Sequence, residues 1–374
     1  MENVTRSHSL SIGIVGLPNC GKSTLFNALT KNSVPAENYP FCTIDKNIGV
    51  VQIPDERLDR LSNFFKAQKV VPSAMTFVDI AGLVKGASKG EGLGNQFLSH
   101  IREVDAIIYV LRAFKGDSVV HVYNRIDPVD DFEIVQSELI IKDIESVEKR
   151  YESVKRNSKS GITESIAMEF SVLEKILKGL NEGKPVIDMV LKKEEREIVH
   201  DLFLLTDKPR IFILNVKEGM DDENLEEWKK KLAEISGDTE NKYIIEADVK
   251  LLSDLADMKE EEFNEYVQLL GKKPVTVEDI IKKAYERLNL ITFYTGSSKE
   301  CNAWSIQKGA DIKSAAGVIH TDFEKNFITA DVVNVDDLIN AGGWGVAKEK
   351  GLVKNHGKEY IVNDGDYVVI LANA

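Results

Sequence analysis

A short segment near the N-terminus has the residue types and spacing of a phosphate-binding loop. Residues 16–23 read GLPNCGKS and match the pattern G-x-x-x-x-G-K-[ST]. The two glycines let successive backbone N–H groups converge on phosphate oxygens, and the start of the following helix adds partial positive charge. Lys22 supplies a full charge to the β- and γ-phosphates, and the Ser23 hydroxyl can bind Mg²⁺. The loop predicts nucleoside triphosphate binding through Asn19, Cys20, Gly21, Lys22, Ser23 and Thr24.

A second motif predicts the rest of the metal site. Asp79 ends an apolar strand and Gly82 follows in a D-x-x-G pattern, which after a phosphate-binding loop indicates an Mg²⁺ partner and an N–H near the γ-phosphate. Thr43 has a hydroxyl that completes the expected metal set of Ser23, Thr43 and Asp79. Leu83 stands where a water-positioning glutamine is expected, so hydrolysis should be slow unless another group substitutes. The glycines within residues 82–94 favour a segment ordered by nucleotide, the alternative being a flexible surface loop.

The base-binding motif departs from the guanine pattern N-K-x-D. Residues 215–218 read NVKE, so valine replaces the covering lysine and the longer Glu218 replaces the guanine-binding aspartate. Leaving buried polar groups unpaired disfavours guanine. Asn215 can instead pair with the N6 and N7 edge of adenine. The motif therefore favours ATP over GTP.

Several β-branched runs predict strands with helical patterns between many of them, which favours an α/β layer with a mostly parallel sheet. These strands are expected at residues 11–15, 47–53, 75–79, 106–111, 210–215 and 242–246. Between residues 111 and 210 the apolar positions alternate at steps of four and three on both sides of a polar turn at 157–161. This spacing predicts a projecting antiparallel helical hairpin, with two helices of an ordinary bundle as the alternative.

After residue 290 a small, independently folded α+β domain is expected, with strands at 292–294, 303–306, 327–332, 359–362 and 367–371. The whole chain has 374 residues, three cysteines and a net charge of −13. That composition predicts a soluble cytoplasmic protein, with no zinc site, no membrane segment and no sequence-blind binding to DNA. A locally basic stretch at residues 142–159, with six basic and four acidic residues, suits an RNA contact or an ordinary solvated helix face.

The ordered motifs resemble the YchF / Obg-like ATPase family over nearly the whole chain, most specifically at residues 79–97 and in TDFEK at 321–325. The resemblance implies a Ras-like P-loop domain (residues 8–132 and 206–290), an inserted coiled-coil arm (133–205) and a C-terminal TGS domain (291–374). It implies ATP hydrolysis with Mg²⁺, GTP use in some members, and ribosome association.

The same resemblance suggests further site residues. It assigns the adenine edge to the backbone of Val216. It assigns the missing catalytic glutamine's role to His121, which among its flanking valines could equally be a packed or surface histidine. Asn19 resembles an asparagine that accompanies K⁺ activation in related GTPases. Lys22, His121 and Gly82 are therefore the catalytic candidates.

Three functions fit these motifs. The first is a slow Mg²⁺-dependent ATPase, expected to be a monomer, whose nucleotide state gates ribosome binding. The second is a GTPase that assists ribosome assembly, which requires Glu218 to accept guanine. The third is a nucleotide-sensing adaptor in which hydrolysis is incidental.

Overall fold

The N-terminal sheet of the computed structural model is a mostly parallel layer that ends at the phosphate-binding loop. The structure describes residues 10–31, 47–80, 104–114, 125–158, 163–217, 219, 223–238 and 240–373. The strand order is β2-β4-β1-β5-β6-β7, and every neighbouring pair is parallel except β2 with β4. This confirms the predicted sheet. The strands are β1 (Leu10–Val15), β2 (Ile48–Gln52), β4 (Ala74–Asp79), β5 (Ala106–Arg112), β6 (Arg210–Asn215) and β7 (Ile244–Ala247).

Helices cover both faces of this sheet, because its central strands are apolar on both sides. One face packs against α1 (Lys22–Thr30), α8 (Val249–Leu255) and α10 (Val277–Arg287). The other face packs against α7 (Leu225–Ser236) and the first turns of α4 (Pro128–Asn157). The outlying α9 (Glu260–Leu270) connects α8 to α10 and has no buried residue.

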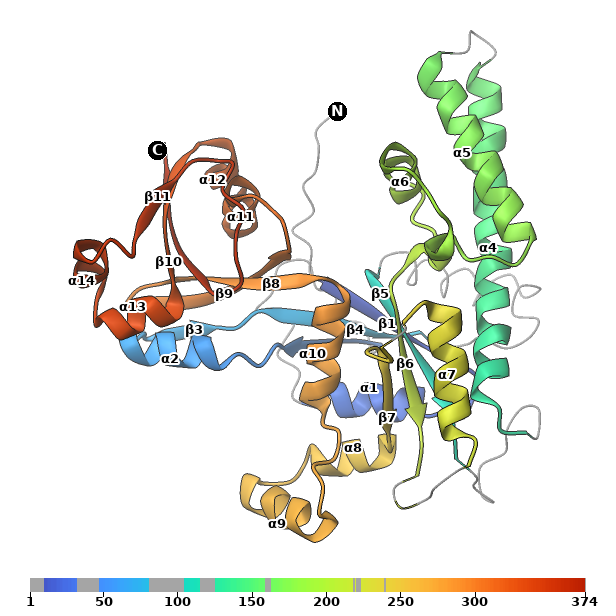
Figure 1. Cartoon of the computed structure of the whole chain (residues 1–374), viewed down its shortest axis with the longest axis horizontal. Coiled ribbons are helices and arrows are strands. Elements are labelled where there is room, and N and C mark those ends of the chain that lie inside the picture. The colour runs from blue at the N-terminus through green and yellow to red at the C-terminus, as the bar shows by residue number, and fades with distance from the viewer. Residues whose placement is uncertain are drawn as a thin grey trace.

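The interval between β5 and β6 contains a long helical pair. Asp127 caps α4 and Thr163 caps α5 (Glu164–Asn181), each accepting a hydrogen bond from a backbone N–H of the first turn. The apolar positions with alternating four- and three-residue spacing pack into one cluster along both helices. Figure 1 shows the pair extending away from the sheet on the right, which favours the hairpin over a bundle. The connection back to β6 contains α6 (Lys193–His200) and short 3-10 turns at Val186–Asp188 and Leu205–Asp207.

A second sheet forms the C-terminal part, in the order β11-β10-β12-β8-β9-β3. The predicted strand at residues 359–362 is wrong. Only Ile361 makes a bridge there, with Asp311, and the hydrogen bonds of Tyr360 and Val362 with Ile312 and Ala310 flank that single bridge. The elements are β8 (Leu290–Gly296), β9 (Glu300–Gln307), α11 (Ile312–Ile319), α12 (Thr321–Lys325), β10 (Phe327–Asn334), α13 (Val335–Ala341), α14 (Trp344–Glu349), β11 (Lys354–His356) and β12 (Asp366–Ala372).

The C-terminal sheet is not built from the C-terminal residues alone, contrary to the expectation of an independent domain. Its edge strand β3 (Lys69–Val71) comes from the N-terminal third and pairs in parallel with β9. The preceding helix α2 (Glu56–Phe65) buries Leu58 and Leu61 in the same core as Tyr294 and Cys301. Residues 56–71 therefore leave the N-terminal sheet after β2, complete the second sheet, and return as β4 (Figure 1).

Among the helices that the structure describes, none is both long enough and apolar enough to cross a membrane.

Candidate functional site

The phosphate-binding loop runs from the end of β1 to the start of α1. Its two glycines are required because neighbouring atoms lie too close to leave room for a Cβ. A Cβ on Gly16 would lie 2.4 Å from the carbonyl oxygen of Val110. Gly21 has φ of 108°, and a Cβ there would lie 2.5 Å from Nδ2 of Asn215. No other residue type fits either position without displacing backbone or a buried amide. The pattern predicted from the sequence is thus also a packing requirement.

Two further loop residues set its shape. Asn19 has φ of 62°, a left-handed conformation that asparagine tolerates better than most residues. Cys20 is buried, and burial raises the pKa of its thiol. Cys20 therefore fills space beneath the loop as a neutral thiol, and its contribution to nucleotide binding lies with its backbone. Thr24 is exposed in the first turn of α1.

Lys22 is the first residue of α1 and its side chain folds back over the loop. Its ammonium group donates a hydrogen bond to the carbonyl oxygen of Leu17, with Nζ and O 3.0 Å apart. This contact holds the charge on the loop at the positive end of the helix. The arrangement concentrates positive potential where an anionic group would lie against the loop N–H groups.

Ser23, in the first turn of α1, lies next to Asp79, the last residue of β4. Because β1 and β4 are parallel neighbours, with Ile14 opposite Asp79, the residues that follow β1 meet the end of β4. The hydroxyl Oγ of Ser23 lies 3.1 Å from Oδ2 of Asp79. The second carboxylate oxygen, Oδ1, is buried and has no hydrogen-bond partner among the described residues.

That orphaned oxygen is the feature that tests whether Mg²⁺ fits. A buried carboxylate oxygen without a partner is costly, and a hard cation or its water shell relieves that cost. A serine hydroxyl beside a carboxylate is the oxygen donor pair that Mg²⁺ takes together with nucleotide phosphates. The residues therefore fit the ion. The described residues contain no cluster of three or more His, Cys, Asp or Glu side chains.

Asn215 lies beside the phosphate-binding loop, and its amide is used there. Its Nδ2 donates to the carbonyl oxygen of Cys20 at 2.8 Å, and its Oδ1 accepts from the N–H of Val249 at 3.2 Å. The side chain is 6% exposed. It joins the loop to the start of α8, a structural role in addition to the expected contact of this amide with the adenine edge, which stays a prediction. The role of tether could not be inferred from the sequence, since Cys20 and Asn215 are 195 positions apart.

The neighbouring residues of the base motif have structural contacts of their own. The N–H of Val216 donates to the carbonyl oxygen of Ala247 at 3.1 Å, which extends the β6–β7 pairing. Asp248 caps α8 by accepting from the N–H groups of Lys250 and Leu251. In the nearby strand, Glu246 forms an ion pair with Lys229. The Glu246–Asp248 stretch therefore contacts α7 through Glu246 and begins α8 through Asp248.

Several predicted site residues lie outside the described residues. These are Thr43 of the metal set, Gly82, Leu83 and the glycines that follow, His121, and Glu218 of the base motif. The described part of the site therefore consists of the phosphate-binding loop, Asp79, Asn215 and Val216.

The tether at Asn215 gives a testable expectation. Asn215→Ala removes both bonds and leaves a buried carbonyl oxygen and a buried N–H unpaired, which costs about 1–3 kcal/mol for each group left without a partner. We expect a lower free energy of unfolding in urea and weaker binding of a non-hydrolysable ATP analogue. Asn181→Ala, which removes an exposed amide bonded to Leu177, is the matched control and should change neither quantity measurably. Equal stability of the two variants would contradict the tether.

Comparison with known proteins places the chain among P-loop proteins. Residues 11–157 match the family profile described as 50S ribosome-binding GTPase, and residues 290–373 match the YchF GTPase C-terminal profile, described as a protein of unknown function. The proteins named ribosome-binding ATPase YchF from Bacillus subtilis and from Escherichia coli O157:H7 are each 44% identical to it over 361 residues, covering 96% of this chain and 98% of theirs. A solved structure of the Schizosaccharomyces pombe YchF GTPase aligns with a TM-score of 0.83 at 38% identity, covering 97% of this chain and 98% of that one.

Proposed function

Because the chain belongs to the YchF family, we propose that it is a slow Mg²⁺-dependent ATPase that binds the ribosome according to its nucleotide state. The observation that supports this most directly is the contact between Ser23 and Asp79 beside a complete phosphate-binding loop. The ribosome and ATP are proposed from the names of the relatives. The phosphate-binding loop with Ser23 and Asp79 has the chemistry that ATP and Mg²⁺ require.

The proposed reaction is attack of water on the γ-phosphorus of ATP, with cleavage of the bond to the β-phosphate oxygen. Lys22 and the loop N–H groups neutralise the charge that the phosphate oxygens bear. Ser23, Asp79 and Thr43 would hold Mg²⁺, which when bound neutralises charge between the β- and γ-phosphates. Gly82 would donate its N–H to the γ-phosphate. Leu83 cannot orient water, so turnover should be slow, and His121 is the candidate that positions or deprotonates it.

Val216 and Glu218 would contribute to the preference for ATP together with Asn215, whose amide uses one of its two N–H groups and its oxygen for the loop and α8 and keeps a second N–H for a base. We propose that the backbone of Val216 meets the adenine edge and that Glu218 does not accept guanine as an aspartate would. Asn19 is the position through which K⁺ would act, and hydrolysis in KCl against NaCl tests it. RNA contact by the hairpin, monomeric state and cytoplasmic location also stay predictions.

A second candidate, a GTPase that assists ribosome assembly, is favoured by two of the names, the 50S ribosome-binding GTPase profile and the Schizosaccharomyces pombe YchF GTPase. The two candidates share the phosphate and metal site and differ only in the base. An adaptor that senses nucleotide without needing hydrolysis would use the same contacts.

The path of the chain supports control of the C-terminal domain by nucleotide. The two metal candidates Thr43 and Asp79 flank the segment β2–α2–β3–β4, and the middle of that segment belongs to the second sheet. The guanidinium of Arg57 forms two hydrogen bonds with the carboxylate of Asp364, at 2.6 and 3.3 Å, and Arg60 pairs with Asp336 at 2.5 Å. A shift of either metal candidate would therefore pull on α2 and, through β3, on the second sheet.

The division into domains is proposed in a modified form. The units remain the first part of the P-loop domain (8–132), the hairpin arm (133–205), the second part of the P-loop domain (206–290) and the TGS domain (291–374). Helix α2 and strand β3 are assigned to the TGS core. The hairpin would be the coiled-coil arm of the family.

The experiment that tests the proposal is co-sedimentation with ribosomes in the presence of a non-hydrolysable ATP analogue or ADP. We expect affinities that differ at least about fivefold between the two states, the lower end of typical allosteric coupling. Arg57→Ala, which disconnects α2 from Asp364, should bring the two affinities together while ATP turnover without ribosomes stays unchanged.

The matched control for that variant is Lys231→Ala, which removes an exposed ion pair with Glu227 on α7. It should leave the nucleotide dependence intact. An Arg57→Ala protein with undiminished dependence would show that coupling does not pass through the contact between Arg57 and Asp364.

A further inference from the structure

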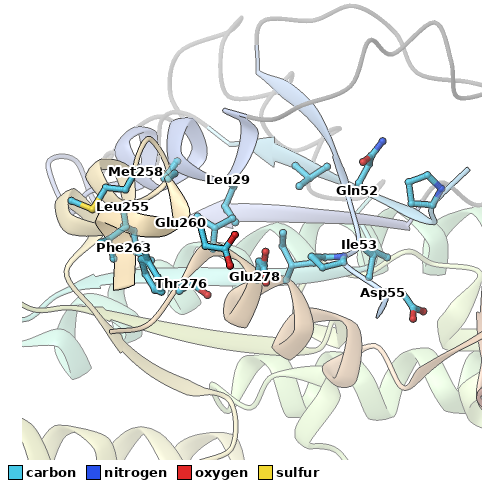
Figure 2. A pocket seen from close by; sticks show the side chains of 18 of the residues that line it. Leu29, Gln52, Ile53, Asp55, Leu255, Met258, Glu260, Phe263, Thr276 and Glu278 are labelled. Carbon is cyan, nitrogen blue, oxygen red and sulfur yellow. The ribbon is translucent and has the colours of Figure 1, made fainter. Parts of the chain in front are cut away.

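A groove of about 780 Å³ lies away from the phosphate-binding loop, on the side of the N-terminal sheet covered by α1. Its walls come from α1, β2, α2, α8, α9 and α10. Figure 2 shows its side chains spread along a line, from Met258 and Phe263 at one end to Asp55 at the other. The groove is elongated, as a site for a segment of chain is, and it uses no residue assigned to the nucleotide.

The floor of this groove is apolar. Leu29 of α1, Ile53 after β2 and Leu255 of α8 line it and are at most 7% exposed. Met258 and Phe263 are only partly buried at the end formed by α9. The apolar surface that a partner could contact therefore lies mainly at this end of the groove.

The helix α9 at one end of the groove buries no residue, although it contains Phe263, Tyr266, Val267 and Leu270. Leu269 on the same helix is 87% exposed. An amphipathic helix normally places its apolar side chains against a core. Of these apolar side chains, Phe263 lines the groove and is available to another molecule there.

The rim of the groove is acidic. Asp59, Glu260 and Glu278 are exposed, and within the described part of the chain no ion pair or side-chain hydrogen bond engages their carboxylates. In the view of Figure 2, Glu260 and Glu278 both appear between Met258 and Asp55. Lys273 is the basic residue among those that line it, and Asp55 is occupied by Arg57 and Tyr294.

We propose that this groove binds a cationic amphipathic helix of another protein. The apolar face of that helix would lie against Met258 and Phe263, and its lysine or arginine side chains would face Asp59, Glu260 and Glu278. The carboxylates repel nucleic acid phosphates. They also disfavour a second copy of this chain, whose net charge is −13. The proposal does not rest on nucleotide hydrolysis.

The test uses the full chain and a fluorescein-labelled synthetic peptide of leucine and lysine, spaced so that leucines share one helix face. Fluorescence anisotropy at physiological salt measures its Kd. We expect saturable binding, and a scrambled peptide of the same composition should bind at least about tenfold more weakly, because its leucines share no face. The double variant Glu260→Lys with Glu278→Lys should raise the Kd of the amphipathic peptide by a similar factor.

Two further variants separate the groove from general charge and from misfolding. Glu240→Lys with Glu349→Lys makes the same change in net charge at exposed sites outside the groove and should leave Kd nearly unchanged. Phe263→Ser leaves the charge unchanged and should weaken binding, with circular dichroism verifying that the variant is folded. Equal weakening by the two double variants, or no binding by the wild type, would overturn the proposal. So would a wild-type dimer in sedimentation that Phe263→Ser dissociates, because a second copy would then occupy the groove.

Discussion

Replacing Lys22 with alanine is expected to lower kcat/KM for ATP by roughly three orders of magnitude, or about 4 kcal/mol of transition-state stabilisation. The side chain provides the full positive charge on the phosphate-binding loop, and its one described bond, to the carbonyl oxygen of Leu17, is local. The variant should therefore fold normally, with an unchanged melting temperature. Steady-state release of inorganic phosphate measures the effect.

The matched control for this prediction is Lys31→Ala, at the other end of the same helix. Lys31 pairs with Asp257 and donates to the carbonyl oxygen of Ser253, on the side of α1 that faces α8. It should leave kcat/KM within a factor of two or so of the wild type. Comparable losses in both variants would mean that α1 itself is perturbed, and an active Lys22→Ala protein would contradict the assigned role.

Replacing Asp79 with asparagine is expected to remove most of the Mg²⁺ dependence of nucleotide binding and to lower turnover by roughly a hundredfold or more. The carboxylate contacts Ser23 through Oδ2 and leaves Oδ1 buried without a partner among the described residues. Neutralising such a group relieves a desolvation cost, so the apo variant should be no less stable than the wild type. Its defect should appear only with metal present.

Calorimetric titration of a non-hydrolysable ATP analogue, with and without Mg²⁺, separates these effects. In the wild type Mg²⁺ should strengthen binding, whereas in Asp79→Asn the two affinities should converge. Asp257→Asn changes an exposed carboxylate on the surface and should retain the wild-type response. A full Mg²⁺ response in Asp79→Asn would rule out this carboxylate as part of the metal site.

The features that could be predicted from the sequence are those whose residues lie close together along the chain. The phosphate-binding loop is one segment between a strand and a helix, and its pattern directly reflects the space around Gly16 and Gly21. The hairpin was predicted because apolar residues repeat at steps of three and four over many turns. The parallel sheet followed from apolar strands separated by helices.

The features that could not be predicted depend on contacts between distant segments. β3 has three residues, too few for a periodic pattern, and only its pairing with β9 makes it a strand. The hydrogen bonds between Arg57 and Asp364 join residues that are 307 positions apart in the sequence. The residue type of Asn215 indicates a contact with adenine, but it gives no sign of the hydrogen bond that the amide donates to the carbonyl oxygen of Cys20. The apolar residues near Ile361 predict a strand, whereas the backbone there makes one isolated bridge, with Asp311.

The central claim, that ATP is the working nucleotide, is tested most directly by calorimetric titration of the wild-type protein with non-hydrolysable ATP and GTP analogues in the presence of Mg²⁺. The phosphate and metal contacts are common to both ligands, so any difference in Kd reports on the base. We expect the ATP analogue to bind at least tenfold more tightly, a difference of about 1.4 kcal/mol. Equal affinities, or tighter binding of the GTP analogue, would contradict the account and make the GTPase assembly factor the better description.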